Sequence, residues 1–213
     1  VRVFCNFCVR EELLKESPFL KVKMPQLDKL LPVIFTDEEI SRVLDACESK
    51  RDKALCYLLL DSGMRQSEAI ALNIEDIDMK TGAVTVLKGK GSKQRIVYIG
   101  TKTKRYLTLY FVERGVTDAT KPVFVSENNG ERIKKHGVSQ LMIRLRDRSK
   151  VKKCSTHTFR RTFATKALKN GMPMMMLQRL MGHENLEMLK RYVALVQDDL
   201  KDASGKYGVV DNL

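Results

Sequence analysis

The spacing of apolar residues predicts a chain of amphipathic helices, interrupted once by a stretch of alternation. Over most of the sequence, apolar positions recur at intervals of three and four residues. A capping box at Thr36 and Glu39, a hydroxyl followed three residues later by a glutamate, marks the start of one helix. The expected helices cover, to within a residue or two, 1–16, 37–47, 51–62, 66–72, 101–114, 137–149, 157–170, 173–181, 185–193 and 198–203.

Between residues 74 and 98 the pattern changes to alternation, which predicts strands. Turn signals at residues 80–82 and 88–93 separate the apolar runs. The apolar positions of these strands are Ile77, Val84, Val86, Ile96 and Tyr98. We therefore expect a three-stranded antiparallel sheet in a mainly α domain, which is an α+β fold.

Three prolines among lysines predict an extended linker over residues 18–34. Residues 1–17 then end a preceding domain. The chain starts at Val1 without Met, inside a predicted helix, so we interpret it as part of a longer protein. The main domain is expected over residues 35–193, followed by a tail at 194–213.

Charge narrows the class of partner. The chain has 39 Lys and Arg against 26 Asp and Glu, a net charge of +13, which favours a polyanion. Nucleic acid is the first candidate. An anionic membrane fits poorly, because no strong basic amphipathic segment stands out and no apolar run has the length of a membrane span.

The chain has five cysteines. This is an odd number, and no secretory signal accompanies it, which indicates reduced thiols in the cytosol. Cys5 and Cys8 lack the second ligand pair of a zinc site.

Arg65 is the first candidate for chemistry. It follows a helix that Gly63 is expected to end, which holds the arginine close to the backbone. Its guanidinium can bind two phosphate oxygens at once, and Glu68 can brace it. By themselves, Arg65 and Glu68 are more commonly a surface ion pair on a helix.

Lys90 lies between two glycines at a predicted hairpin tip. Such a tip can enter a DNA groove, and the amine can donate a proton to a leaving oxygen. Lys88, Lys93 and Arg95 surround it and are candidate DNA contacts. A solvated basic hairpin is the plainer interpretation, and the spacing of a Walker A loop is absent.

His157 and Arg160 share one face at the start of a predicted helix, where an anion is also favoured. Together they can form a phosphate pocket that contains a titratable group. His183 follows Gly182 at the end of a later helix, and Tyr192 comes nine residues further on. Each of these residues also has an ordinary structural explanation: a helix cap, a surface cation or a core tyrosine.

The order of these residues resembles the tyrosine recombinases, also called phage integrases, from about Val33 to Tyr192. The matching motifs are G-x-R-x-S-E at Arg65, G-K-G at Lys90, H-x-x-R at His157 and Arg160, G-H at His183, and the tyrosine at Tyr192. Arg161 stands where the family often has a second histidine, and adds a possible phosphate contact. The resemblance implies that residues 1–17 end a core-binding, SAM-like domain.

The resemblance implies a site-specific recombinase that cuts and rejoins double-stranded DNA. Tyr192 would attack phosphorus to give a covalent 3′-phosphotyrosine, with Lys90 as general acid, and neither ATP, metal nor another cofactor would be needed. It implies a homotetramer on paired DNA sites, with the tail docked on a neighbouring protomer; a tail folded onto its own domain is the alternative. We expect a cytoplasmic, nucleoid-associated protein with no membrane partner and no small-molecule substrate. The alternatives are a type IB topoisomerase that relaxes DNA and a catalytically idle DNA-binding module.

Overall fold

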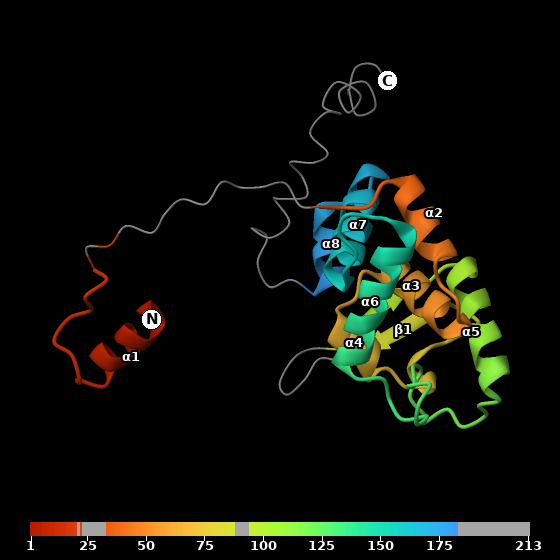
Figure 1. The fold of residues 1–213 in the computed structure, drawn as a ribbon, viewed down its shortest axis with the longest axis horizontal. Helices are drawn as coiled ribbons and strands as arrows, with labels where there is room; N and C mark the ends of the chain where they lie inside the picture. The colour runs from red at the N-terminus through yellow and green to blue at the C-terminus, as the bar shows by residue number, and fades with distance from the viewer. Residues whose placement is uncertain (21, 23–32, 88–93, 183–213) are drawn as a thin grey trace, which may run out of the picture. The chain divides into compact units, whose positions relative to one another are not determined.

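The computed structural model describes residues 1–20, 22, 33–87 and 94–182. The chain separates into two compact units, Val1–Leu30 and Leu31–Leu213. In the second unit, helices pack around a short antiparallel sheet (Figure 1). Its elements, in chain order, are α2 (Asp37–Asp45), α3 (Lys50–Ser62), α4 (Gln66–Ala71), the 3₁₀ helix η1 (Ile74–Asp76), β1 (Ala83–Val86), β2 (Arg95–Tyr98), α5 (Thr101–Arg114), α6 (Lys135–Ser149), α7 (Thr156–Lys169) and α8 (Met174–Met181).

The first unit contains helix α1 (Arg2–Arg10), which is shorter than the sequence predicts. The expected end was near Glu16. Instead, Glu12 adopts a left-handed conformation with φ of 58°, and the N–H of Leu13 donates to the carbonyl of Cys8 at 2.8 Å. A left-handed residue closes a helix in this way, but it is usually a glycine, so no local signal indicated an early end here.

Helix ends in the second unit follow the local signals in the sequence. The Thr36 hydroxyl accepts the Glu39 N–H at 3.2 Å and the Glu39 carboxylate accepts the Thr36 N–H at 3.0 Å, which confirms the predicted capping box. Gly63 ends α3 with a left-handed φ of 58°, as expected. Ser155 caps α7 by accepting the Thr158 N–H at 3.2 Å. These ends determine where the candidate arginines leave α3 and enter α7.

The sheet is smaller than the sequence predicts. Strands β1 and β2 pair antiparallel, with Ala83 opposite Tyr98. Among the described residues, the expected third strand is reduced to a single bridge between Ile77 and Val84. The pairing continues only to Asp78, whose N–H donates to the Ala83 carbonyl at 2.8 Å, and the Asp78 carboxylate then accepts backbone hydrogen bonds from the turn that reverses the chain. The predicted count of three strands was wrong, whereas the mainly helical fold with a small antiparallel sheet is confirmed.

Helix α3 lies at the centre of the hydrophobic core. Leu55, Leu58 and Leu59 are buried almost completely, and α3 packs against both α5 and α7. Burial of each such side chain stabilises the fold by about 1.5–3 kcal/mol. Because α3 lies along α7, the segment that follows Gly63 emerges beside Arg160, and this is how the core positions the candidate site.

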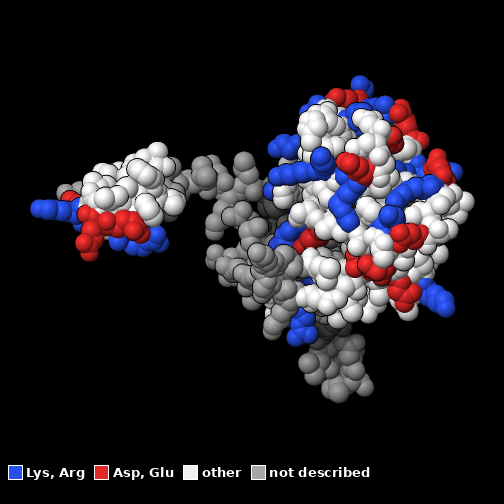
Figure 2. Space-filling view, turned by 90° about the horizontal axis from the view of Figure 1, so that it is seen from below, with Lys and Arg blue, Asp and Glu red and all other residues white. Residues whose placement is uncertain are grey.

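The surface of the second unit carries both signs of charge. Figure 2 shows Lys and Arg interspersed with Asp and Glu on one face. In the described part of the chain, no helix combines the length and apolar character needed to span a membrane. In the same part, no group of three His, Cys, Asp or Glu side chains is arranged to hold a metal ion.

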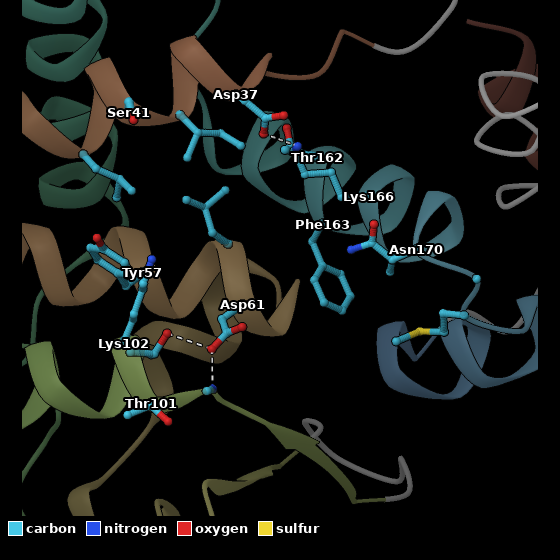
Figure 3. A pocket seen from close by; sticks show the side chains of 18 of the residues that line it. Asp37, Ser41, Tyr57, Asp61, Thr101, Lys102, Thr162, Phe163, Lys166 and Asn170 are labelled. Atoms are coloured by element: carbon cyan, nitrogen blue, oxygen red, sulfur yellow. Dashed lines mark hydrogen bonds and ion pairs between the residues drawn. The ribbon is translucent and has the colours of Figure 1, made fainter.

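A cavity of about 1090 Å³ lies between α2, α3, the start of α5, α7 and α8 (Figure 3). Its lining combines apolar side chains, such as Ile40 and Met176, with polar ones, such as Asp61. Phe163 projects into it from α7 and also lies against Gly63. Of the predicted catalytic residues, the three that the structure describes, Arg65, His157 and Arg160, are not in this lining.

Candidate active site

Arg65 is the N-cap residue of α4 and comes two residues after the left-handed end of α3. A Cβ atom at Gly63 would lie only 2.1 Å from the Phe163 ring, and φ is positive there, so this close passage requires glycine. The Arg65 side chain is 40 % exposed. The side chain is therefore fixed at its base and partly accessible to solvent.

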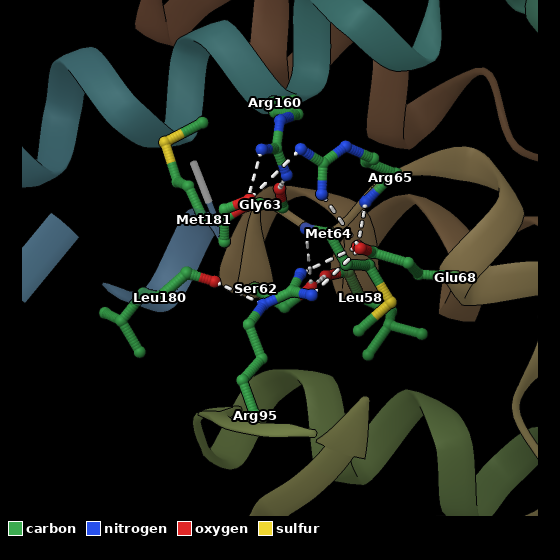
Figure 4. Close-up of polar contacts among 11 residues, drawn as sticks. Leu58, Ser62, Gly63, Met64, Arg65, Glu68, Arg95, Arg160, Leu180 and Met181 are labelled. Carbon is green, nitrogen blue, oxygen red and sulfur yellow. Dashed lines mark hydrogen bonds and ion pairs between the residues drawn. The ribbon is translucent and has the colours of Figure 1, made fainter. Parts of the chain in front are cut away.

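Glu68 is buried beside Arg65 and accepts hydrogen bonds from two arginines (Figure 4). Its Oε1 accepts from Arg65 Nη1 at 3.1 Å and from Arg95 Nη1 at 2.8 Å. Its Oε2 accepts from the Arg65 backbone N–H at 2.7 Å and from Arg95 Nη2 at 2.7 Å. Both carboxylate oxygens are thus satisfied, and the contact suggested by the Arg65–Glu68 spacing is present.

The surroundings of Glu68 keep it ionised. Burial by itself would raise the pKa of this carboxyl group. The hydrogen bonds from Arg95 and from the Arg65 backbone, together with the positive charge of Arg95, outweigh burial and lower the pKa to about 2. Glu68 therefore carries a full negative charge at neutral pH and can hold both guanidinium groups.

Three arginines converge on the C-terminal end of α8, and we call Arg65, Arg95 and Arg160 the arginine cluster. Arg95 Nε donates to the carbonyl of Leu180 at 2.7 Å. Arg160 Nη2 donates to the next carbonyl, that of Met181, at 2.7 Å, and Arg65 Nη2 donates to the Gly182 carbonyl at 3.3 Å. The last carbonyls of a helix lack partners within the helix, and cations are favoured at this end of the dipole.

Arg160 also ties the cluster to α3. It is only 6 % exposed, and its Nη1 donates to the Gly63 carbonyl at 2.5 Å. One buried side chain thereby joins α7, the end of α3 and the end of α8 (Figure 4). Arg65 and Arg160, which are ninety-five positions apart in the sequence, meet because both bind the last carbonyls of α8.

Around Glu68, positive charge exceeds negative charge. Two guanidinium groups, those of Arg65 and Arg95, share the one carboxylate of Glu68, and the partial negative charge at the end of α8 compensates only part of the difference. Arginine is suited to bind a phosphate through two oxygens at once. This arrangement can therefore take one phosphodiester and stabilise additional charge that develops on it.

The first turn of α7 lies next to the first turn of α4. The Thr156 hydroxyl is 3.5 Å from the Gln66 side-chain oxygen, and Gln66 Nε2 donates to the Lys135 carbonyl at the start of α6 at 2.9 Å. His157 is the following residue on α7 and is exposed, as is Arg161. The structure thus brings the helix turns of His157 and Arg65 together.

Five of the predicted residues lie outside the described part of the chain: Lys88, Lys90, Lys93, His183 and Tyr192. The described segments that adjoin them are nonetheless close to the cluster. Strand β2 begins at Arg95, soon after the predicted hairpin tip, and α8 is followed by Gly182, which directly precedes His183. Both of these ends are bound by hydrogen bonds within the arginine cluster.

Arg95 differs from the expectation that it contacts DNA. Its side chain is only 9 % exposed, and all three of its nitrogens donate to Glu68 or to the Leu180 carbonyl. The alternation in β2 contains the signal that was missed. Arg95 lies on the same face as Val97 and Ile99, which are buried, while Ile96 is half exposed. An inward-facing arginine needs a carboxylate partner, and Glu68 is that partner.

Comparisons of the sequence with known proteins find one family and its members. Residues 34–198 match the phage integrase family. The tyrosine recombinase XerD of Oceanobacillus iheyensis is 33 % identical, over 97 % of this chain and 72 % of that protein. The tyrosine recombinase XerC of Myxococcus xanthus is 32 % identical, over 94 % of this chain and 71 % of its own length.

Solved structures show the same fold. The XerA recombinase superposes with a TM-score of 0.72 at 23 % identity, over 93 % of this chain and 71 % of that one. The Tn1549 transposon integrase, in complex with a circular intermediate DNA, gives a TM-score of 0.76 at 18 % identity, over 90 % and 71 % of the two chains.

Proposed function

Since this chain belongs to the phage integrase family and matches tyrosine recombinases over nearly its whole length, we infer that it is a site-specific recombinase that cuts and rejoins DNA. The observation that supports this most strongly is the arginine cluster, where the guanidinium groups of Arg65 and Arg95 share the single carboxylate of Glu68 and Arg160 lies beside them at the end of α8. A surplus of preorganised positive charge is what a phosphodiester under attack requires.

We assign the phosphate to Arg65 and Arg160. Their guanidinium groups lie together at the end of α8, and the Arg65 side chain is partly exposed to solvent. Both would donate hydrogen bonds to the nonbridging oxygens, and these bonds strengthen as phosphorus becomes pentavalent. Arg161, exposed on the next position of α7, would contact a neighbouring phosphate.

The remaining roles follow from the family resemblance. The oxygen of Tyr192 would form a bond to phosphorus while the bond from phosphorus to the 5′-oxygen breaks. His157 would take the tyrosine proton or orient the phosphate, and Lys90 would protonate the departing 5′-oxygen. His183 would donate a hydrogen bond to a nonbridging oxygen. Attack by the 5′-hydroxyl of a second strand reverses these steps and releases the tyrosine, so the bond energy is conserved without ATP.

We propose the assembly separately: a homotetramer on two DNA duplexes, associated with the nucleoid. Residues 1–17 would end a core-binding domain, residues 18–34 would link it to the catalytic domain at 35–193, and residues 194–213 would dock on a neighbour. The cavity between α2, α3, α7 and α8 would accept the apolar side chains of that tail, because its lining is partly apolar.

Covalent capture tests the proposed chemistry. The protein is incubated in EDTA with a library of nicked duplexes whose flanking sequences are randomised, and adducts that survive denaturation are isolated and sequenced. We expect adducts joined to a 3′-phosphate through Tyr192, identified by mass spectrometry, and none with Tyr192→Phe. Adducts that persist in Tyr192→Phe would refute the nucleophile, and free relaxation of supercoiled DNA without strand exchange would favour a topoisomerase.

Assembly is tested separately on the captured sequence. Leu200 belongs to the apolar side chains of the tail. Leu200→Asp is expected to abolish complexes that contain two duplexes in native gels, while binding to a single duplex persists. Unchanged two-duplex complexes would contradict docking of the tail on a neighbour.

A further inference from the structure

Arg95 is the one member of the arginine cluster to which the family pattern gives no catalytic role. It begins β2, directly after the predicted hairpin, and its side chain points into the protein. Its three nitrogens have three partners: Nε donates to Leu180, and Nη1 and Nη2 donate to the two oxygens of Glu68. A buried side chain whose three nitrogens all donate to protein groups is well placed to hold those groups in position.

The effect of Arg95 on Glu68 determines how Arg65 is held. Each Glu68 oxygen accepts one bond from Arg95 and one from Arg65, and the second of the Arg65 bonds comes from its backbone. The Arg65 guanidinium therefore makes only one hydrogen bond to the carboxylate. Without Arg95, a buried negative charge would face Arg65 alone, and the attraction at short range would draw its guanidinium inward.

The same arginine fixes the row of carbonyls on which the cluster rests. Arg95 holds the carbonyl of Leu180, and the next two carbonyls are held by Arg160 and Arg65. A shift of β2 relative to α8 would move this row and change the angle at which the other two arginines project.

We propose that Arg95 is a positioning residue for DNA cleavage, a role that rests on the proposed recombinase function: by occupying Glu68 and the Leu180 carbonyl, it keeps the Arg65 guanidinium turned toward the scissile phosphate. Arg95 itself touches neither the DNA nor the reacting atoms. Replacing Arg95 should slow the same step of DNA cleavage that replacing Arg65 slows, but by a smaller factor.

Three versions of the captured duplex distinguish a positioning role of Arg95 from a purely structural role and from an effect on Lys90. The first has an ordinary scissile phosphodiester. In the second, a methylphosphonate replaces one nonbridging oxygen by methyl and removes the negative charge that Arg65 neutralises. In the third, a sulfur replaces the bridging 5′-oxygen, which gives a leaving group that departs without a proton and so bypasses Lys90.

With the ordinary duplex, Arg95→Met is expected to slow adduct formation by about 100-fold, the size of effect that small misplacement of a catalytic group produces. With the methylphosphonate duplex, the loss relative to wild type should shrink to about threefold, because no charge remains for Arg65 to stabilise. With the sulfur-bridged duplex, Arg95→Met should lose as much rate relative to wild type as it does with the ordinary duplex.

A second substitution provides an independent arm. Glu68→Gln in the Arg95→Met protein removes the carboxylate that draws Arg65 inward, so it should recover about tenfold of the lost rate, a coupling typical of residues in direct contact. Arg95→Lys retains a buried cation for Glu68 and should lie between wild type and Arg95→Met on every substrate. If Arg95→Met does not fold, Arg95→Lys is used in its place.

Arg132 offers a matched control. It too is an interior-facing arginine that holds backbone carbonyls, those of Ile70 at 2.8 Å and Leu72 at 3.0 Å, but it makes no contact with Glu68. Arg132→Met should lower the thermal stability and leave the ratio of rates between the three duplexes as in wild type.

Two results would overturn the positioning role. One is a loss in Arg95→Met that is equal on all three duplexes, as a purely structural role predicts. The other is recovery with the sulfur-bridged duplex alone, which would place the effect at Lys90. If wild-type protein forms no adduct with any duplex, the recombinase assignment fails as well, whereas wild-type adducts with unchanged Arg95 variants refute only the positioning role.

Discussion

At the start of α3, Arg51 and Asp52 form a buried ion pair, just as Arg95 and Glu68 do beside the start of α4. In both places an arginine donates to a carboxylate at 2.6–2.9 Å, and all four side chains are less than 10 % exposed. The chemistry of the two pairs is the same. Their surroundings are different.

The Arg51–Asp52 network, which includes Glu127 and Arg144, contains two cations and two carboxylates. Glu127 is 3.2 Å from Arg51, and Arg144 is 3.8 Å from Asp52. At the arginine cluster, two guanidinium groups, those of Arg65 and Arg95, share the one carboxylate of Glu68. A balanced network satisfies itself and serves the fold, whereas an unbalanced one is complete only when an anion binds. The two buried ion pairs therefore differ in the charge balance of the residues around them.

The largest expected effect is on the stability of the balanced network. Arg51→Met leaves Asp52 buried without its closest partner and should lower the free energy of unfolding by about 3–5 kcal/mol. Chemical denaturation measures this loss. Arg144→Met, which removes a side chain that is 44 % exposed, is the control and should have a much smaller effect. A similar loss in both variants would mean that the balance of charge is not what matters.

The second effect is on reaction rate at the unbalanced cluster. Arg65→Ala should slow adduct formation by about 10²–10³-fold, the cost of removing one donor to a developing oxyanion. Because the Arg65 side chain is partly exposed and Glu68 retains Arg95, the loss of stability should stay below about 1 kcal/mol. Rate and unfolding measurements on the same variant check both values. A stable Arg65→Ala protein with wild-type rate would contradict the comparison.

The third effect is the dependence of stability on acid. The pKa of Glu68 is about 2 in the folded protein, against an ordinary value of 4.5. As pH falls, the unfolded chain takes up this proton first. The contribution of Glu68, on the order of 2 kcal/mol, is therefore complete above about pH 5 and fades toward pH 2. Glu68→Gln should remove this part of the pH dependence, as measured by thermal unfolding between pH 2 and 7.

Asp118→Asn is the control for acid stability. A hydrogen bond from the Thr120 hydroxyl lowers the pKa of this exposed carboxylate, and solvent screens it. The difference between wild type and Asp118→Asn should change much less with pH. An equal change in the two variants would show that burial among arginines adds nothing to the Glu68 interaction.

Local signals predicted much of the fold. The capping box at Thr36, the glycine ends at Gly63 and Gly182, and the helix that begins after Ser155 all act within a few residues, so the sequence displays them directly. The features that failed depend on distant partners or unusual conformations. The early end of α1 depends on a left-handed glutamate, and the missing third strand on the turn at Asp78.

In the candidate site too, some features could be predicted from local sequence and others depend on distant partners. The order of chemical residues could be read from the sequence, and the structure brings Arg65, Arg160 and the turn of His157 together. The place of Arg95 could not be read in that way. A lysine- and glycine-rich hairpin suggests DNA, and only the partner Glu68, twenty-seven positions earlier, shows that this arginine faces inward.

The most direct test of the central claim is a crystal structure of the protein with orthovanadate and the two DNA halves of a captured site. Vanadate would bridge Tyr192 and the 5′-hydroxyl and adopt the geometry of pentavalent phosphorus. We expect its equatorial oxygens to accept hydrogen bonds from Arg65 and Arg160, while Arg95 remains on Glu68. Vanadium bound with neither guanidinium within about 3.5 Å of its oxygens would contradict the claim that the surplus charge of the arginine cluster serves the scissile phosphate.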